Sequence, residues 1–117
     1  LHKMFLENKA EAKMIRSLRT IHHEYNEHLD IPRLAKEEDM SVSSFHTHFK
    51  KVTSLSPLQY IKKIRLHKAM DLLTRRDMQV NETAYATGYE SSSQFSKDFK
   101  SYYGYPPKEA KASFEII

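Results

Sequence analysis

The chain has 117 residues and a mass of 13.8 kDa, enough for one domain or two very small ones with a modest core. It contains no cysteine, which excludes disulfides, thiolate zinc sites and thiol chemistry. Only two glycines and four prolines occur, so helices should dominate. The sequence shows no nucleophile–base spacing, phosphate-binding loop or metal motif, and we therefore expect no enzyme and no cofactor.

Charge is distributed unevenly along the chain, within a formal net charge of +4. Residues 1–40 carry 7 basic and 8 acidic groups, residues 41–105 carry 10 and 5, and residues 106–117 carry 2 and 2. The basic surplus is expected of a segment that faces a polyanion. A solvated helix surface that happens to be basic explains it equally well, so charge alone does not decide.

The chain begins with a predicted helix that ends near Tyr25. Residues 1–12 are predicted to be a linker helix leading in from an N-terminal domain, because the chain starts at Leu1 rather than at a methionine. Neither this segment nor any other is apolar for the roughly 18 residues of a membrane span, and we expect a cytoplasmic protein without a membrane partner. The buried face of the first helix is predicted from residues at helical spacing: Met14, Ile15, Leu18, Ile21, His22 and Tyr25.

A unit of about 27 residues then occurs twice, as comparison of the chain with itself shows. "FHTHFKKVTSLSP" (45–57) matches "FSKDFKSYYGYPP" (95–107) at an offset of 50, and "IPRLAKEEDM" (31–40) matches "VNETAYATGY" (80–89) at an offset of 49. Each copy is predicted to be a short helix, a tight turn and a second helix. The turn falls at Asp39 in the first copy and at Gly88 in the second, because these residues tolerate a left-handed backbone.

The second helix of the first copy is predicted to start after Ser41 as its N-cap. Four apolar residues recur on one stripe, which we predict to be core: Val42, Phe45, Phe49 and Val52. The opposite side carries Ser43, Thr47, Lys50 and Lys51. His46 and His48 lie about 200° apart on this helix, at about 100° per residue, so they cannot hold one metal ion, and we expect no metal site.

Residues 56–76 form an uninterrupted helix candidate between the two copies. Ser56, Pro57 and Gln59 make a capping-box start. One broad face is predicted to pack against both copies: Leu58, Ile61, Ile64, Leu66, Ala69, Met70, Leu72 and Leu73.

The second copy repeats the pattern of the first. Phe95, Phe99 and Tyr102 form its apolar stripe, and the residues away from the stripe are Ser93, Gln94, Ser96, Lys97 and Lys100. Short polar side chains allow a helix to sit deep in a groove while lysines reach phosphates. The alternative, that these serines only solvate a surface, is weakened because they recur at matched positions.

These motifs carry a resemblance to a known family. "LDIPRLAKEEDMSVSSFHTHFKKVTSLSPLQYIKKIRLHKAMDLL" followed by "VNETAYATGYESSSQFSKDFKSYYGYPP" resembles the tandem helix-turn-helix DNA-binding domain of the AraC/XylS family of bacterial transcription regulators, over roughly residues 14–110. The sequence departs from the family pattern at Asp39, where the family usually has glycine, and at Thr83, where it usually has an aliphatic residue. The first departure predicts a strained or redirected turn, and the second predicts looser packing.

The resemblance implies an all-α fold of about seven helices in two helix-turn-helix subdomains joined by the long central helix. On this basis we expect a linker helix at 1–12, subdomains at 13–55 and 77–117, and the connecting helix at 56–76. The second helix of each motif should enter a major groove. It implies double-stranded DNA as partner, RNA polymerase as a further partner if the protein activates, and a small-molecule effector only through an N-terminal domain.

The resemblance also implies which residues meet DNA. Base-reading positions fall on Ser43, His46, Thr47, Ser93, Gln94, Ser96 and Lys97. We assign contacts with the DNA backbone to Ser44, Lys50, Lys51 and Lys100, and we expect His48 to be partly buried at the flank. The alternative function is a helical protein-interaction module, whose outward faces should carry exposed aromatic residues rather than serines and lysines.

Overall fold

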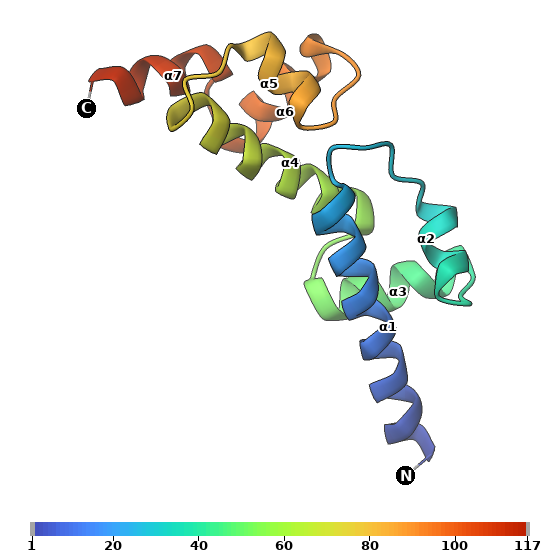
Figure 1. Cartoon of the computed structure of the whole chain (residues 1–117). Helices are drawn as coiled ribbons and strands as arrows, with labels where there is room; N and C mark the ends of the chain where they lie inside the picture. Colours follow the sequence, from blue (N-terminus) through green and yellow to red (C-terminus); the bar gives the residue numbers. More distant parts are fainter. Residues whose placement is uncertain (1, 117) are drawn as a thin grey trace. The chain divides into compact units, whose positions relative to one another are not determined.

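The computed structural model describes the backbone of residues 2–116 and the side chains of residues 9–112 (Figure 1). Over residues 2–116 it contains seven helices and no strand, which confirms the predicted all-α class. The helices are α1 (His2–Glu24), α2 (Ile31–Glu37), α3 (Val42–Thr53), α4 (Pro57–Thr74), α5 (Val80–Ala86), α6 (Ser92–Tyr103) and α7 (Pro107–Ile116). The chain divides into two compact units, residues 1–61 and residues 62–117, and the division falls within α4.

The first unit is built where α1 and α2 pack against α3. Its core consists of residues that are at most 3% exposed: Met14, Ile21, Leu34, Ala35, Phe45, Phe49 and Ile61. The rings of Phe45 and Phe49 lie 5.6 Å apart, and Tyr60 from α4 meets Phe49 edge-on at 5.5 Å. The two phenylalanines predicted as core are therefore confirmed as its centre.

Four side chains of α1 and α3 that were predicted to be buried are exposed instead. One is His22, whose polar ring faces solvent. Ile15 is 48% exposed and Val52 is 43% exposed because both border an open hollow of about 400 Å³ between α1 and α3. Val42 is 42% exposed, and it lies in the first turn of α3, ahead of the packed Phe45. The apolar stripe of α3 is thus core only at its two phenylalanines.

The second unit is built around α6, which packs against α5 and α7. Its core residues are at most 8% exposed: Leu66, Ala69, Leu73, Ala84, Tyr89, Phe95, Phe99 and Ala110. Tyr102 was predicted to lie on the apolar stripe but is 47% exposed, and its hydroxyl lies 2.8 Å from Nε2 of His67. Phe95 and Phe99 are completely buried, as predicted.

Helix α4 supplies side chains to both cores, as its broad apolar face predicted. Ile61 belongs to the first core, and Leu66, Ala69 and Leu73 belong to the second. The capping box is confirmed at the start of the helix, where Ser56 N donates to Gln59 Oε1 at 3.0 Å and Gln59 N donates to Ser56 Oγ at 3.2 Å. Leu58 is 56% exposed, so its assignment to the packed face was wrong: it lies in the first turn, before the buried Ile61.

The turn between the two helices of each motif has the same geometry in both copies. Asp39 and Gly88 have φ values of 55° and 95°, which confirms that these positions need a left-handed backbone. The next residue closes each turn with the same backbone hydrogen bond, Met40 N to Ala35 O at 2.9 Å and Tyr89 N to Ala84 O at 3.0 Å. Asp39 therefore adopts the conformation that glycine adopts in the second copy.

Thr83, which stands at a position expected to be aliphatic, is completely buried. Its hydroxyl donates to Gln79 O at 2.8 Å, so the buried polar group has a partner. A satisfied hydroxyl avoids the desolvation cost that an unpaired one carries. The substitution for an aliphatic residue is thus accommodated within α5.

Candidate nucleic-acid interface

Helix α3 is held so that one side is buried and the other faces solvent. Ser41 caps the helix, since its Oγ accepts from Ser44 N at 3.1 Å. Because Phe45 and Phe49 fix the inner side, five of the predicted DNA contacts of α3 are exposed: Ser43, His46, Thr47, Lys50 and Lys51. The Thr47 hydroxyl donates to Ser43 O at 3.1 Å, which leaves its oxygen free to accept a further hydrogen bond.

Ser44 and His48 form a pair one helical turn apart on the flank of α3. Both are half-buried, which confirms the expected position of His48. Nδ1 of His48 lies 2.9 Å from Ser44 O, and because a carbonyl oxygen only accepts, Nδ1 carries the proton. The backbone N–H of Ser44 is already used by the Ser41 cap, so a phosphate could be reached only by its hydroxyl, which lies 3.4 Å from Nδ1 of His48.

Lys51 lies beside the hollow between α1 and α3. The hollow is lined by Ala10, Glu11, Met14, Ile15, His48, Lys51 and Val52. Lys51 is exposed, and unlike Lys50 it lines the same hollow as the acidic Glu11. Lys50 and Lys51, both predicted to contact the DNA backbone, thus have different surroundings.

Helix α6 presents its outer side in the same way as α3. Ser91 caps it by accepting from Gln94 N at 3.1 Å, and Phe95 and Phe99 are its buried residues. The predicted contacts that are fully exposed are Ser93, Gln94, Lys97 and Lys100, whereas Ser96 is half-buried. The structure therefore brings four of the five predicted contacts of this motif onto one open helix surface.

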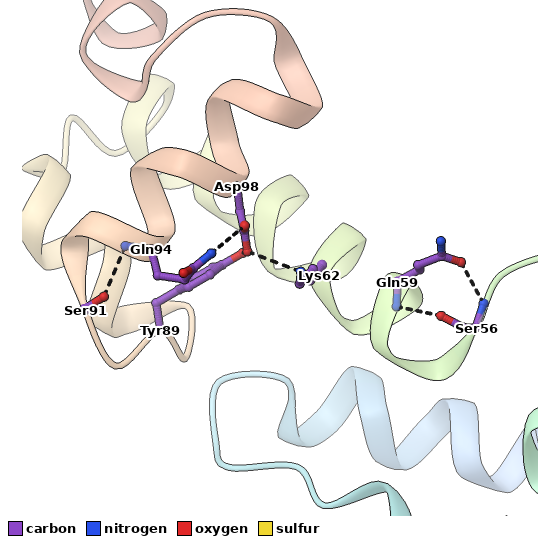
Figure 2. A network of polar contacts seen from close by, with 7 residues as sticks. All are labelled: Ser56, Gln59, Lys62, Tyr89, Ser91, Gln94 and Asp98. Carbon is purple, nitrogen blue, oxygen red and sulfur yellow. Dashed lines mark hydrogen bonds and ion pairs between the residues drawn. The ribbon is translucent and has the colours of Figure 1, made fainter.

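Gln94 is held by a polar network, and sequence reasoning did not identify this network (Figure 2). Nε2 of Gln94 donates to Oδ1 of Asp98 at 2.8 Å. The Tyr89 hydroxyl donates to Oδ2 of the same carboxylate at 3.1 Å, and Lys62 Nζ lies 3.8 Å from that oxygen. The spacing of four residues between Gln94 and Asp98 was the available signal, since such residues are neighbours on a helix.

The surroundings of Tyr89 are largely shielded from water. Burial raises the pKa of its hydroxyl well above the ordinary value, and the neighbouring charge of Asp98 raises it further. The Arg65 guanidinium lies over the ring at 5.9 Å from its centre. Tyr89 therefore remains a neutral hydrogen-bond donor to Asp98 at all physiological pH values.

Across the described side chains, no group of three or more histidine or carboxylate residues is close enough to hold a metal ion. Within the same part of the chain, no helix has the length and apolar character needed to span a bilayer.

Comparison with known proteins gives consistent likenesses. A family model described as a helix-turn-helix domain matches residues 34–113. The chain is 29% identical over 107 residues to the Msm operon regulatory protein of Streptococcus mutans, and 27% identical over 107 residues to the HTH-type transcriptional activator RhaS of Salmonella schwarzengrund. Each match covers 92% of this chain but only 38% of the relative, so the chain spans well under half the length of these proteins.

Solved structures with a similar fold include a complex with DNA. The DNA-binding domain of the transcriptional factor AdpA, bound to a target DNA, matches with a TM-score of 0.84 at 25% identity, over 88% of this chain and 93% of that chain. The C-terminal domain of AraT from Geobacillus stearothermophilus has a TM-score of 0.82 at 24% identity, over 86% of this chain and 84% of that one. An AraC-type regulator from Chromobacterium violaceum has a TM-score of 0.80 at 21% identity, over 89% and 93%.

Proposed function

Since this chain belongs to the AraC-type helix-turn-helix family, the DNA-binding domains of transcription regulators, we propose that it reads double-stranded DNA by sequence through α3 and α6. Each helix enters a major groove, and the two grooves are successive, about 34 Å apart along the DNA. The base-reading residues are Ser43, His46 and Thr47 of α3 and Ser93, Gln94, Ser96 and Lys97 of α6.

The observation that supports this most is the matched architecture of the two helices. Each begins at a capping serine, buries two phenylalanines four residues apart, and leaves small polar and basic side chains in solvent. Short polar side chains let the backbone approach base edges, and the flanking lysines neutralise phosphates. A helical protein-interaction module would need exposed aromatic residues at these positions instead.

Lys50 and Lys100 occupy the same place in the two motifs, in the last turns of α3 and α6, and both are exposed. We assign them, together with Ser44 and Lys51, to the DNA backbone. Such contacts supply affinity that depends on salt but not on sequence.

The relatives are longer than this chain, which covers only 38% of their length. RNA polymerase is the expected partner if the protein activates transcription, and we expect a small-molecule effector only through an N-terminal domain. Because its target is bacterial DNA, the protein acts in the cytoplasm. It acts by binding and not as an enzyme, in keeping with its family.

The experiment is a selection of DNA sites from a random library with the chain as given, followed by titration of a selected and a scrambled duplex. We expect one enriched sequence and tighter binding to it than to the scrambled duplex, by about 10³-fold or more at physiological salt. Adding a chelator to parallel titrations should leave the affinity for both duplexes unchanged. Equal binding to both duplexes, or none to either, would contradict sequence reading and favour the interaction module.

A further inference from the structure

We propose that Asp98 is a positioning residue that holds Gln94 for recognition of adenine in the half of the DNA site read by α6. This inference rests on the proposed function and deepens it. It assigns a role to a largely buried carboxylate that makes no contact with DNA in the proposal above, and it names the base that Gln94 reads.

The chemistry of the two partners determines how the Gln94 amide is turned. An ionised carboxylate can only accept hydrogen bonds, so the amide nitrogen of Gln94 must face Asp98, as it does at 2.8 Å. The amide is thereby prevented from flipping. One N–H of the amide and its carbonyl oxygen are left for another partner.

That remaining pair of groups matches one base. Adenine offers an N6 amino donor and an N7 acceptor in the major groove, and a glutamine amide satisfies both at once. Gln94 is exposed on the outer side of α6, so its free donor and acceptor are accessible. A flipped amide would present the same groups in reversed order, and Asp98 excludes that state.

Asp98 itself is firmly held, which makes it suited to this task. Its side chain is only 13% exposed, and its second oxygen accepts from Tyr89 and lies near Lys62, as Figure 2 shows. The ring of Tyr89 packs edge-on against Phe95 at 5.3 Å and is therefore fixed by the core of the unit. Gln94 is thus connected through Asp98 to buried structure, so that less side-chain freedom is lost when it binds a base.

The first motif has no amide held by a carboxylate at the equivalent positions. At the offset of 50 residues, Gln94 and Asp98 correspond to Ser44 and His48. There the side chains also meet, with Ser44 Oγ 3.4 Å from Nδ1 of His48, but Nδ1 lies closer to Ser44 O, at 2.9 Å. A serine hydroxyl has no amide whose donor and acceptor could be held in one order. The adenine preference created by such a pair should therefore appear in one half of the site only.

The test compares base preferences of the parent, Asp98→Asn, Gln94→Ala and the double variant on a selected site with each base pair replaced in turn. In the parent we expect adenine at one position in one half-site, and loss of that preference in Gln94→Ala. An asparagine can accept or donate, so Asp98→Asn releases the amide and lowers the adenine preference at that position by about 2- to 10-fold. In the double variant, Asp98→Asn should add nothing to the effect of Gln94→Ala.

The control is Asp77→Asn, which removes the same charge in the same unit. Asp77 has a side chain that is 75% exposed, lies 3.4 Å from Lys111 and has a φ of 52°, which asparagine tolerates. Any general gain in affinity from loss of a negative charge should appear in both variants. Only Asp98→Asn should change the preference at a single base pair.

Two results would overturn the inference and leave the proposed function intact. One is a Gln94-dependent preference that Asp98→Asn leaves at its parental value, and the other is a Gln94-dependent preference for a base other than adenine. A parent that selects no sequence overturns both proposals.

A second measurement applies even if Asp98→Asn does not fold. In the NMR spectrum of the free parent, the side-chain amide of Gln94, identified by its absence in Gln94→Ala, should exchange with solvent more slowly than that of the exposed Gln59. Equal exchange rates would show an amide that is not held and would refute the positioning role.

Discussion

Ser54 and Gly104 occupy the same left-handed position at the C-termini of α3 and α6, with φ values of 67° and 86°. Each donates its backbone N–H to the carbonyl of a matched lysine, Ser54 to Lys50 at 2.7 Å and Gly104 to Lys100 at 2.8 Å. The same turn is thus made by glycine in the second motif and by serine, which carries a β-carbon, in the first. A β-carbon in this conformation costs free energy that glycine does not.

The two substitutions at these positions should therefore have opposite effects on stability. Gly104→Ala should destabilise the second unit by about 1 to 2 kcal/mol through backbone strain. No atom lies within 4 Å of the added β-carbon, so a clash cannot account for the loss. Ser54→Gly should stabilise the first unit by about 0.5 to 1 kcal/mol, since relief of strain is partly offset by the entropy of glycine.

Hydrogen exchange of core amides in each unit measures these changes separately. Effects of the same sign in both variants would show that the left-handed turn is not what distinguishes the two motifs.

Truncation of the phenylalanines should loosen the unit to which each belongs. Phe49→Ala and Phe99→Ala each remove a completely buried ring, at a cost of about 3 to 5 kcal/mol. Val52→Ala serves as the control on the same helix, because Val52 is 43% exposed and borders the open hollow. Thermal unfolding followed by circular dichroism should show a large loss for the two phenylalanine variants and little change for the valine variant.

Lysine variants should change salt dependence without changing sequence preference. Lys50→Ala or Lys100→Ala removes one phosphate contact, so the slope of log K against log salt should become shallower by about 0.9. Binding to selected and scrambled duplexes should weaken by similar factors. Lys9→Ala, which removes an exposed charge from α1, is the control and should leave the slope unchanged. A changed base preference with an unaltered slope would mean that these lysines read bases.

Reader variants should divide the DNA site into two halves. Thr47→Ala or His46→Ala should relax base preference in one half, and Lys97→Ala in the other, each by about 1 to 3 kcal/mol for a good direct contact. A scan of single base replacements with each variant measures this. Indifference to Lys97→Ala and to Gln94→Ala throughout the site would leave only α3 as a reader of sequence.

Acid should destabilise the second unit through His67. Burial lowers the pKa of His67 below its ordinary value of 6.5, and the charge of Lys63 lowers it further. The unfolded chain then binds a proton at this histidine more readily than the folded chain does. The contribution of neutral His67 to the free energy of unfolding is therefore complete above about pH 6.5, and it is lost as the pH falls through the lowered pKa of the folded state. The effect should be small because the side chain is largely exposed.

Melting temperatures measured from pH 7.5 to pH 5 check this expectation. The parent should lose more stability on acidification than His67→Gln, which cannot titrate at this position. Identical pH profiles would indicate that His67 does not contribute.

The sequence by itself determined the local structure of this protein. The internal repeat located both motifs, and the capping serine Ser41, the capping box at Ser56 and the left-handed positions at Asp39 and Gly88 all appear where the sequence predicted them. These features depend on neighbours within a few residues, so a single stretch of sequence contains what is needed to predict them. The paired phenylalanines could also be predicted from local sequence, because each lies at the centre of the apolar face of its helix.

The tertiary structure decided where packing ends and which polar side chains meet. Val52, Ile15 and Leu58 lie on apolar stripes yet are exposed, because a helical pattern identifies a face but not how far a neighbouring helix covers it. The junction of Asp98 with Tyr89 and Lys62 joins three separate stretches of sequence, so no local pattern could reveal it. The orientation of Gln94 depends on this junction, because the Asp98 carboxylate is largely buried only when α4, α5 and α6 pack around one core.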